Sequence, residues 1–289
     1  MPTGKRFWGF TLLCLAVIGC GKSTGDTKRY SIQGEVISLD TQKNLLTLKH
    51  GDIPDFMPAM TMAYELAYPK EATGIAAGDT IRAELVVANG VGRLEKIQLV
   101  AKAAPNAPKP AAQVHLPAPG DVVPDFRFVN QDGRSIHLHQ FRGKPLLITF
   151  IYTRCPLPDF CPRMNENFVR VQALLNKQAA LLKNVELLSI SFDPDYDTPA
   201  VLKHYARLYE KGVAGKNRAD WQFAVPSKKD LPDLSNYFGL IYEPDGGTIS
   251  HSSSTTVVDA NGKVAKWYGD NNWSPEDATK VILQLFGQG

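Results

Sequence analysis

The sequence is poor in cysteine and has no long apolar run, and these absences exclude several classes of protein. Only four cysteines occur among 289 residues, too few for a scaffold of this length built on disulfides. No apolar run reaches the roughly 20 residues that span a bilayer as a helix. Lysine and arginine number 32 against 29 acidic residues, a formal net charge of +3 with no basic block. We therefore do not expect nucleic acid as a partner.

The N-terminus has the pattern of an export signal. A basic pair precedes a short apolar stretch that ends at Ile18, and Gly19 and Cys20 follow. A short apolar segment after a basic patch indicates a signal peptide rather than a membrane span. A small residue before a cysteine resembles the bacterial lipoprotein signal, which implies removal of residues 1–19 and acylation of Cys20. An uncleaved anchor or plain secretion are the alternatives. We expect a membrane-anchored lipoprotein on the periplasmic side, with a tether over residues 20–29.

The rest of the chain divides into two predicted domains. Residues 30–103 alternate polar and apolar side chains in short segments broken by glycine and proline, which favours a small all-β, OB-like barrel of antiparallel strands. Residues 104–120 are rich in alanine and proline and predict an extended linker. Residues 121–289 alternate apolar strands with helical patterns.

The order of elements in the second domain predicts its fold. A continuous apolar segment at 145–152 indicates a strand covered on both faces, and helical spacing follows from Cys161 onward. A second buried strand is predicted at 185–192, a hairpin with an Asn-Gly turn at 257–265, and a capped helix from Ser274. Strand, helix, strand, hairpin and helix in this order favour an α/β thioredoxin-like fold.

Three of the five methionines lie within six residues of the first domain. Met57, Met60 and Met62 follow His50 by a short loop. Thioether sulfur is a soft ligand that suits Cu(I), and imidazole is an acceptable partner. Met60 and Met62, two apart on a predicted strand, point to the same face. The alternative is that these methionines only fill an irregular core.

This segment resembles the CusF family of periplasmic copper- and silver-binding barrels, over roughly residues 30–100. The resemblance implies that His50, Met60 and Met62 bind the ion. It also implies a tryptophan that covers the ion with its ring face, and Met57 stands at that position instead. Met57 is therefore a candidate fourth ligand, through its thioether, or a cover for the ion.

The second domain carries Cys155 and Cys161 in a loop between the 145–152 strand and a helix. The positive partial charge of a helix N-terminus, with Arg154 beside it, favours thiolate. Thiolates are both copper ligands and redox nucleophiles. A structural disulfide or two unconnected thiols are the alternatives. In a thioredoxin fold, the segment of His251 packs beside the helix that carries the cysteines, so a site of two cysteines and one histidine is sterically reasonable.

Residues 121–286 resemble the Sco/SenC family over the whole domain. The matching segments are Pro124-Asp-Phe, Gln131-Asp-Gly, Phe141-Arg-Gly-Lys, Tyr152-Thr-Arg-Cys-Pro, Ser191-Phe-Asp-Pro-Asp-Tyr-Asp-Thr-Pro and His251. The resemblance implies copper binding through Cys155, Cys161 and His251, and a role in assembling the binuclear copper centre of cytochrome c oxidase, as metallochaperone, thiol reductant or both. The family usually has three residues between the cysteines, whereas this chain has five, including two prolines.

The three aspartates of the 191–199 segment invite a calcium reading. Asp193, Asp195 and Asp197 lack the glycine and the distal glutamate of an EF-hand loop. We instead interpret this run as the cap of a helix that begins at Thr198.

The resulting hypothesis is an extracytoplasmic copper-binding assembly factor that captures Cu(I), and also binds Cu(II), and serves the copper-site subunit of cytochrome c oxidase or another extracytoplasmic copper protein. The alternatives are a thiol–disulfide oxidoreductase with Cys155 and Cys161 as its redox pair, a thiol peroxidase, and a copper sequestration protein. Thioredoxin-type oxidoreductases resemble one another in a proline just before the hairpin. This chain has no proline between Pro244 and Pro275, and His251 lies in that region, which favours metal binding over general redox catalysis. We also expect copper to move from the first domain to the more strongly donating thiolates of the second.

Overall fold

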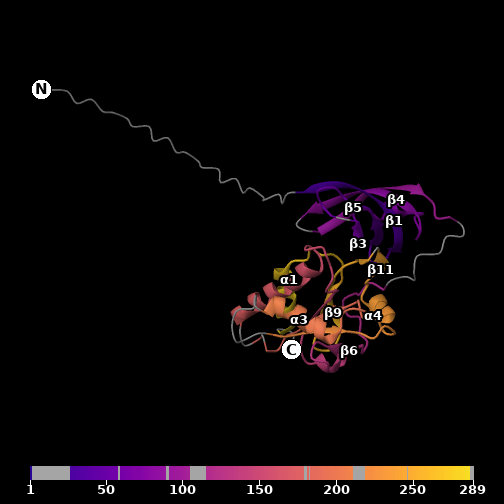
Figure 1. The fold of residues 1–289 in the computed structure, drawn as a ribbon. Helices are drawn as coiled ribbons and strands as arrows, with labels where there is room; N and C mark the ends of the chain where they lie inside the picture. The colour runs from indigo at the N-terminus through magenta and orange to yellow at the C-terminus, as the bar shows by residue number, and fades with distance from the viewer. Residues whose placement is uncertain are drawn as a thin grey trace.

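The computed structural model describes residue 1 and residues 27–57, 59–88, 91–104, 115–178, 181, 183–210, 219–245 and 247–286. Figure 1 shows two bodies, an N-terminal one built mainly of strands and a larger one of strands and helices, with β3 of the first above the β11 region of the second. Residues 2–19 of the predicted signal peptide, and Cys20 after it, lie outside the described residues. No helix in the described ranges is long and apolar enough to cross a membrane.

The first body is a closed barrel with strand order β1-β2-β3-β5-β4. Its strands are β1 (Lys28–Asp40), β2 (Leu45–His50), β3 (Met60–Leu66), β4 (Thr80–Ala88) and β5 (Val91–Ala101), with a short 3-10 helix, η1 (Pro69–Ala72). The expectation of antiparallel pairing throughout is wrong at one seam, because β3 and β5 are parallel. Five strands that alternate in direction leave the third and fifth parallel, and closing the barrel brings them together.

Gly34 allows β1 to approach the strand that carries His50. A Cβ atom at Gly34 would lie 2.3 Å from the carbonyl oxygen of Lys49 and 2.9 Å from the Cα of His50. Gly34 is also the register partner of His50 on β2. Any side chain at this position would push the two strands apart, so the glycine helps to fix His50 in the barrel.

The second body is a seven-stranded sheet in the order β14-β13-β8-β9-β10-β6-β7, with a separate β11–β12 ribbon. Its strands are β6 (Arg127–Asn130), β7 (Ser135–His137), β8 (Leu146–Ile151), β9 (Glu186–Ser191), β10 (Asp220–Val225), β11 (Tyr242–Asp245), β12 (Thr248–His251), β13 (Thr255–Val258) and β14 (Val264–Tyr268). The α-helices are α1 (Cys161–Leu175), α3 (Pro199–Glu210), α4 (Leu231–Tyr237) and α5 (Pro275–Phe286), and the 3-10 helices are η2 (Leu138–Phe141) and η3 (Asn176–Gln178).

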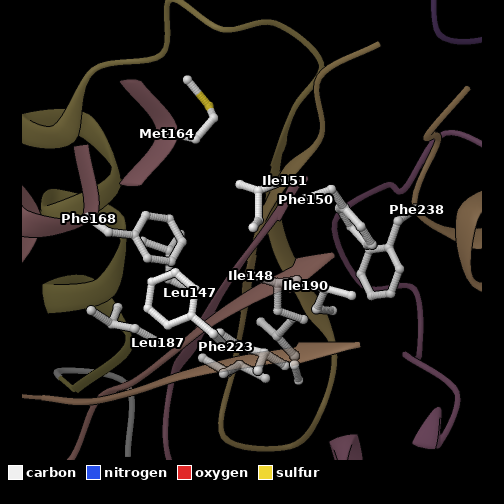
Figure 2. Packing of buried hydrophobic residues seen from close by; sticks show 14 of the residues in the cluster. Leu147, Ile148, Phe150, Ile151, Met164, Phe168, Leu187, Ile190, Phe223 and Phe238 are labelled. Atoms are coloured by element: carbon white, nitrogen blue, oxygen red, sulfur yellow. The ribbon is translucent and has the colours of Figure 1, made fainter. Parts of the chain in front are cut away.

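The centre of this sheet is parallel and fully covered. β8 pairs in parallel with β9, and β9 with β10, and every residue of β8 and β9 is buried. Figure 2 shows Leu147 and Leu187 of these strands together with Phe168 of α1. The predicted apolar strands and the helix that starts at Cys161 are therefore confirmed. The loop between β8 and α1 leaves the sheet at the carboxyl end of β8.

Candidate metal sites

The cysteine loop and the β11–β12 ribbon meet beyond the end of β8. Cys161 is the first residue of α1 and is buried, with Pro162 at the start of the helix. Cys155 lies earlier in the loop and is only partly buried. The ligand atoms of Cys155, Cys161 and His251 lie within 4.8 Å of one another, the one such group of three or more histidine, cysteine and acidic side chains in the described ranges.

His251 presents one ring nitrogen to the thiols. Its Nδ1 lies 2.7 Å from the carbonyl oxygen of Ser252, to which it donates, and its Nε2 lies 3.8 Å from Sγ of Cys161. The Nδ1 hydrogen bond fixes the tautomer that leaves the Nε2 lone pair free for a metal. The rings of Tyr152, Phe160 and Phe192 surround the imidazole, with centroids 5.7, 6.1 and 4.9 Å away.

The two thiols differ in acidity. A hydrogen bond from the Cys161 thiol is the largest cause, and it lowers the pKa of Cys155 to about 4 against the opposing effect of partial burial. Burial, with Cys155 beside it, raises the pKa of Cys161 well above its usual value. At neutral pH the pair therefore holds one thiolate, at Cys155, and one thiol. Two cysteines and one neutral imidazole form a soft donor set that suits Cu(I), so these residues fit the predicted ion.

Two carboxylates hold the start of the cysteine loop. Arg154 donates to Asp193 from both Nε and Nη2, at 3.1 and 2.7 Å. Thr153 donates its amide to Asp197 at 3.0 Å and its hydroxyl to the same carboxylate. Thr198 caps α3 through its hydroxyl, which accepts from the amide of Val201 at 3.4 Å. The capping interpretation is confirmed for Thr198. Asp193 and Asp197 anchor the loop, a role that the sequence analysis missed.

The barrel brings together three of its four predicted ligands on one pair of strands. His50 of β2 is the register partner of Met60 on β3. Met62 pairs with Leu48, which lies two residues before His50 on β2. All three predicted side chains are buried, with 3–4% of their surface exposed. Met60 and Met62 share one face of β3, as the alternation predicts. Burial lowers the pKa of His50, so its imidazole is neutral and able to bind a metal.

Tyr64 occupies the ring nitrogen of His50 that would bind the ion. Nδ1 of His50 donates to the carbonyl oxygen of Gly51 at 2.7 Å, so Nε2 is the acceptor and the hydroxyl of Tyr64 donates to it at 2.8 Å. The same oxygen lies 3.7 Å from Sδ of Met57. Met57 is thus placed beside the site, separated from His50 by a hydroxyl. Tyr64 lies two residues after Met62 on the same strand face, and that spacing is the signal that could have identified it.

Comparison with known proteins places both halves in families. Residues 115–287 match the SCO1/SenC family model, and residues 29–99 match the model described as copper binding periplasmic protein CusF. The chain therefore belongs to the SCO1/SenC family and carries an N-terminal CusF-like domain. Its larger body has the thioredoxin-like fold of that family, and the expected fusion is confirmed. The expectation of copper is confirmed at the level of these families.

Several individual proteins are similar to this chain. The SCO1 protein homolog of Bacillus subtilis is 30% identical over 169 residues, which cover 57% of this chain and 82% of that protein. The solved structure of a SCO1/SenC family lipoprotein from Bacillus anthracis is 26% identical with a TM-score of 0.49, and covers 60% of this chain and 99% of that one. BsSco, described as a member of the Sco family of cytochrome c oxidase assembly proteins, is 27% identical with a TM-score of 0.49, at the same coverage of both chains.

Proposed function

We propose that this protein is an extracytoplasmic copper-binding assembly factor that captures Cu(I) and delivers copper, or reducing equivalents, to the copper centre of cytochrome c oxidase. The observation that carries the proposal is the convergence of Cys155, Cys161 and His251, with ligand atoms within 4.8 Å. The donor set, the fixed tautomer of His251 and the family membership all support copper as the cargo. Another extracytoplasmic copper protein is the alternative client.

The first domain is proposed to bind a second copper ion through His50, Met60 and Met62, with Met57 as a further thioether. Its closed five-stranded barrel supports the OB-like class. We assign residues 30–103 to this domain, 104–120 to the linker and 121–289 to the Sco/SenC domain. Residues 1–19 are proposed as the signal peptide and residues 20–29 as the tether. Cys20, the first residue of the tether, is proposed as the site of the lipid anchor.

Anaerobic titration of the reduced protein with Cu(I) tests both sites. We expect two ions per chain. Replacing Met60 and Met62 with leucine keeps the approximate volume and removes both sulfurs, so one ion should remain. Met164→Leu is the matched control, because this buried methionine accepts from Nε1 of Trp273 in the second domain at 3.2 Å. Unchanged binding in the double variant would contradict the barrel site.

The thiolate site has its own spectroscopic test. The Cu(II) form should show a thiolate-to-copper charge-transfer band that Cys161→Ser removes, and oxidation of Cys155 and Cys161 to a disulfide should abolish binding, since thiolate is the ligand. A band that survives Cys161→Ser would refute the pairing. Delivery is tested by mixing the loaded protein with the apo copper-site subunit of the oxidase and measuring the copper that moves to it.

A thiol–disulfide oxidoreductase is the second candidate, favoured by the acidity of Cys155. Its thiolate would attack a client disulfide, forming a mixed disulfide and releasing one client thiolate. Cys161 would then attack the mixed disulfide after losing its proton, which releases the second client thiol and leaves Cys155 and Cys161 oxidised. Reduction of a client disulfide by the copper-free protein, lost in Cys155→Ser, would support this activity.

A further inference from the structure

Phe160 belongs to the cysteine loop but packs in the core of the other domain. It immediately precedes Cys161, is 4% exposed, and is part of the buried apolar cluster that contains Met60 and Met62. Its ring also lies edge-on to His251, with centroids 6.1 Å apart. One side chain of the loop therefore touches both the barrel core and the histidine of the thiolate site.

Other contacts bring the same two faces together. Strand β12, which ends at His251, contacts β3, which begins at Met60, and Figure 1 shows β3 on the side of the barrel that faces the β11 region. Cys155 packs against the apolar clusters of both domains. At the edge of this interface Nζ of Lys49 lies 2.5 Å from a carboxylate oxygen of Glu243.

A cavity of about 280 Å³ lies in this interface. The barrel lines it with Phe56 and Met57, and the second domain lines it with residues 157–160, Arg163 and two asparagines. Two of these lining residues also hold the loop in place. Arg163 pairs with Asp159 at 2.7 Å, and the side-chain amide of Asn271 donates to the Asp159 carbonyl oxygen at 3.0 Å. Met57 and the cysteine loop thus line one cavity between the two domains.

We propose that copper passes directly between the two metal sites across this docked interface, and that Phe160 is the positioning residue that holds the cysteine loop on the barrel. The proposal rests on the proposed function and adds its route. Cu(I) keeps its oxidation state throughout. Its bonds to thioether and imidazole break as bonds to Cys155 and Cys161 form, and the proton of the Cys161 thiol passes to solvent.

The rate of transfer in the full-length protein distinguishes this route from release into solvent. The cysteine pair is first oxidised, one equivalent of Cu(I) is loaded on the barrel, and a phosphine reductant is added with a weak Cu(I) chelator. The reductant is raised until transfer, rather than reduction, limits the appearance of thiolate–copper absorption. For a solvent route, tenfold more chelator lowers free copper and slows transfer about tenfold. For direct transfer the rate stays unchanged, which is the result we expect.

Variants test the role of Phe160. In Phe160→Ala we expect transfer to become slower and dependent on chelator, while the protein still binds two ions at equilibrium. Leu157→Ala is the matched control, since Leu157 lines the same cavity but is 39% exposed and outside the barrel cluster. If Phe160→Ala does not fold, Glu243→Lys is used in its place. This substitution is exposed, and it replaces the ion pair between Glu243 and Lys49 with two positive charges that repel each other across the interface. Adding Lys49→Glu should then restore the rate.

The outcomes separate the two proposals. Transfer that slows with chelator in the unmodified protein, or that is unaffected by both Phe160→Ala and Glu243→Lys, overturns the direct route and leaves the two copper sites standing. Copper that stays on the barrel after reduction also overturns the transfer and leaves two independent copper sites, whereas failure of Cys155, Cys161 and His251 to bind an ion in the Cu(I) titration contradicts the proposed function itself.

Discussion

Removing the hydroxyl of Tyr64 should tighten copper binding by the barrel. In the metal-free protein this hydroxyl donates to Nε2 of His50 at 2.8 Å, and Cu(I) must displace it to reach the nitrogen lone pair. A buried hydrogen bond contributes about 0.5–1.5 kcal/mol net, and about 1.4 kcal/mol corresponds to a factor of ten in affinity. Tyr64→Phe should therefore raise the Cu(I) affinity about two- to twelvefold, while it weakens the metal-free barrel by a similar free energy.

The assay is a competition titration against a Cu(I) chelator, in a background in which Cys155 and Cys161 are replaced by serine so that the barrel alone binds. Tyr30→Phe is the matched control, because Tyr30 is a barrel tyrosine that stacks on Phe56, with ring centroids 4.3 Å apart. The Cu(I) affinity of the Tyr30→Phe variant should not change. Equal or weaker binding in Tyr64→Phe would refute the reasoning, since it would mean that Tyr64 does not compete with the metal for His50.

Three further predictions concern the second domain and the anchor. In the reduced, metal-free protein, iodoacetamide should modify Cys155 before Cys161. The rate should be nearly constant from pH 6 to 8, because the pKa of Cys155 is lowered to about 4 and the thiolate is already formed. A tenfold rise in the rate per pH unit would contradict this. Arg154→Met leaves the buried carboxylate of Asp193 without its partner and should lower the free energy of unfolding by about 1–2 kcal/mol, measured by denaturant titration, and a change within error would contradict the anchoring role. Cys20→Ala should abolish labelling by a lipid precursor, and a labelled variant would contradict the lipoprotein assignment.

Much of the second domain could be predicted from local sequence. The strands at 146–151 and 186–191 are continuous apolar runs, and Pro162 marks the first turn of α1, so short-range patterns decide these elements. The β11–β12 ribbon was not predicted, although it carries His251. Its strands mix polar and apolar residues, and Gly247 lies in the turn with φ 95°. No regular alternation of apolar residues therefore predicts these strands.

The contacts around the candidate sites were harder to predict than the candidate ligands. Soft donors at short spacing mark Met60 and Met62 as candidate ligands, but the hydrogen bond of Tyr64 to His50 depends on the register between β2 and β3. The packing of Phe160 depends on how two separately folded domains meet. An apolar residue beside a cysteine is consistent with many environments, and nothing in the loop sequence says that the core it enters belongs to the other domain.

The position of Cys155 against both apolar clusters has a consequence for the timing of delivery. Under the proposed function, a client that takes copper from this thiolate would need the surface that the barrel covers, so the barrel and the client would compete for one face. Loading and unloading would then alternate, and the two domains would have to separate once for each ion delivered. The predicted linker would set how quickly they meet again, because tethering keeps the local concentration of the barrel high. The same contact that guides copper inward would thus shield it from other acceptors and limit how often it leaves.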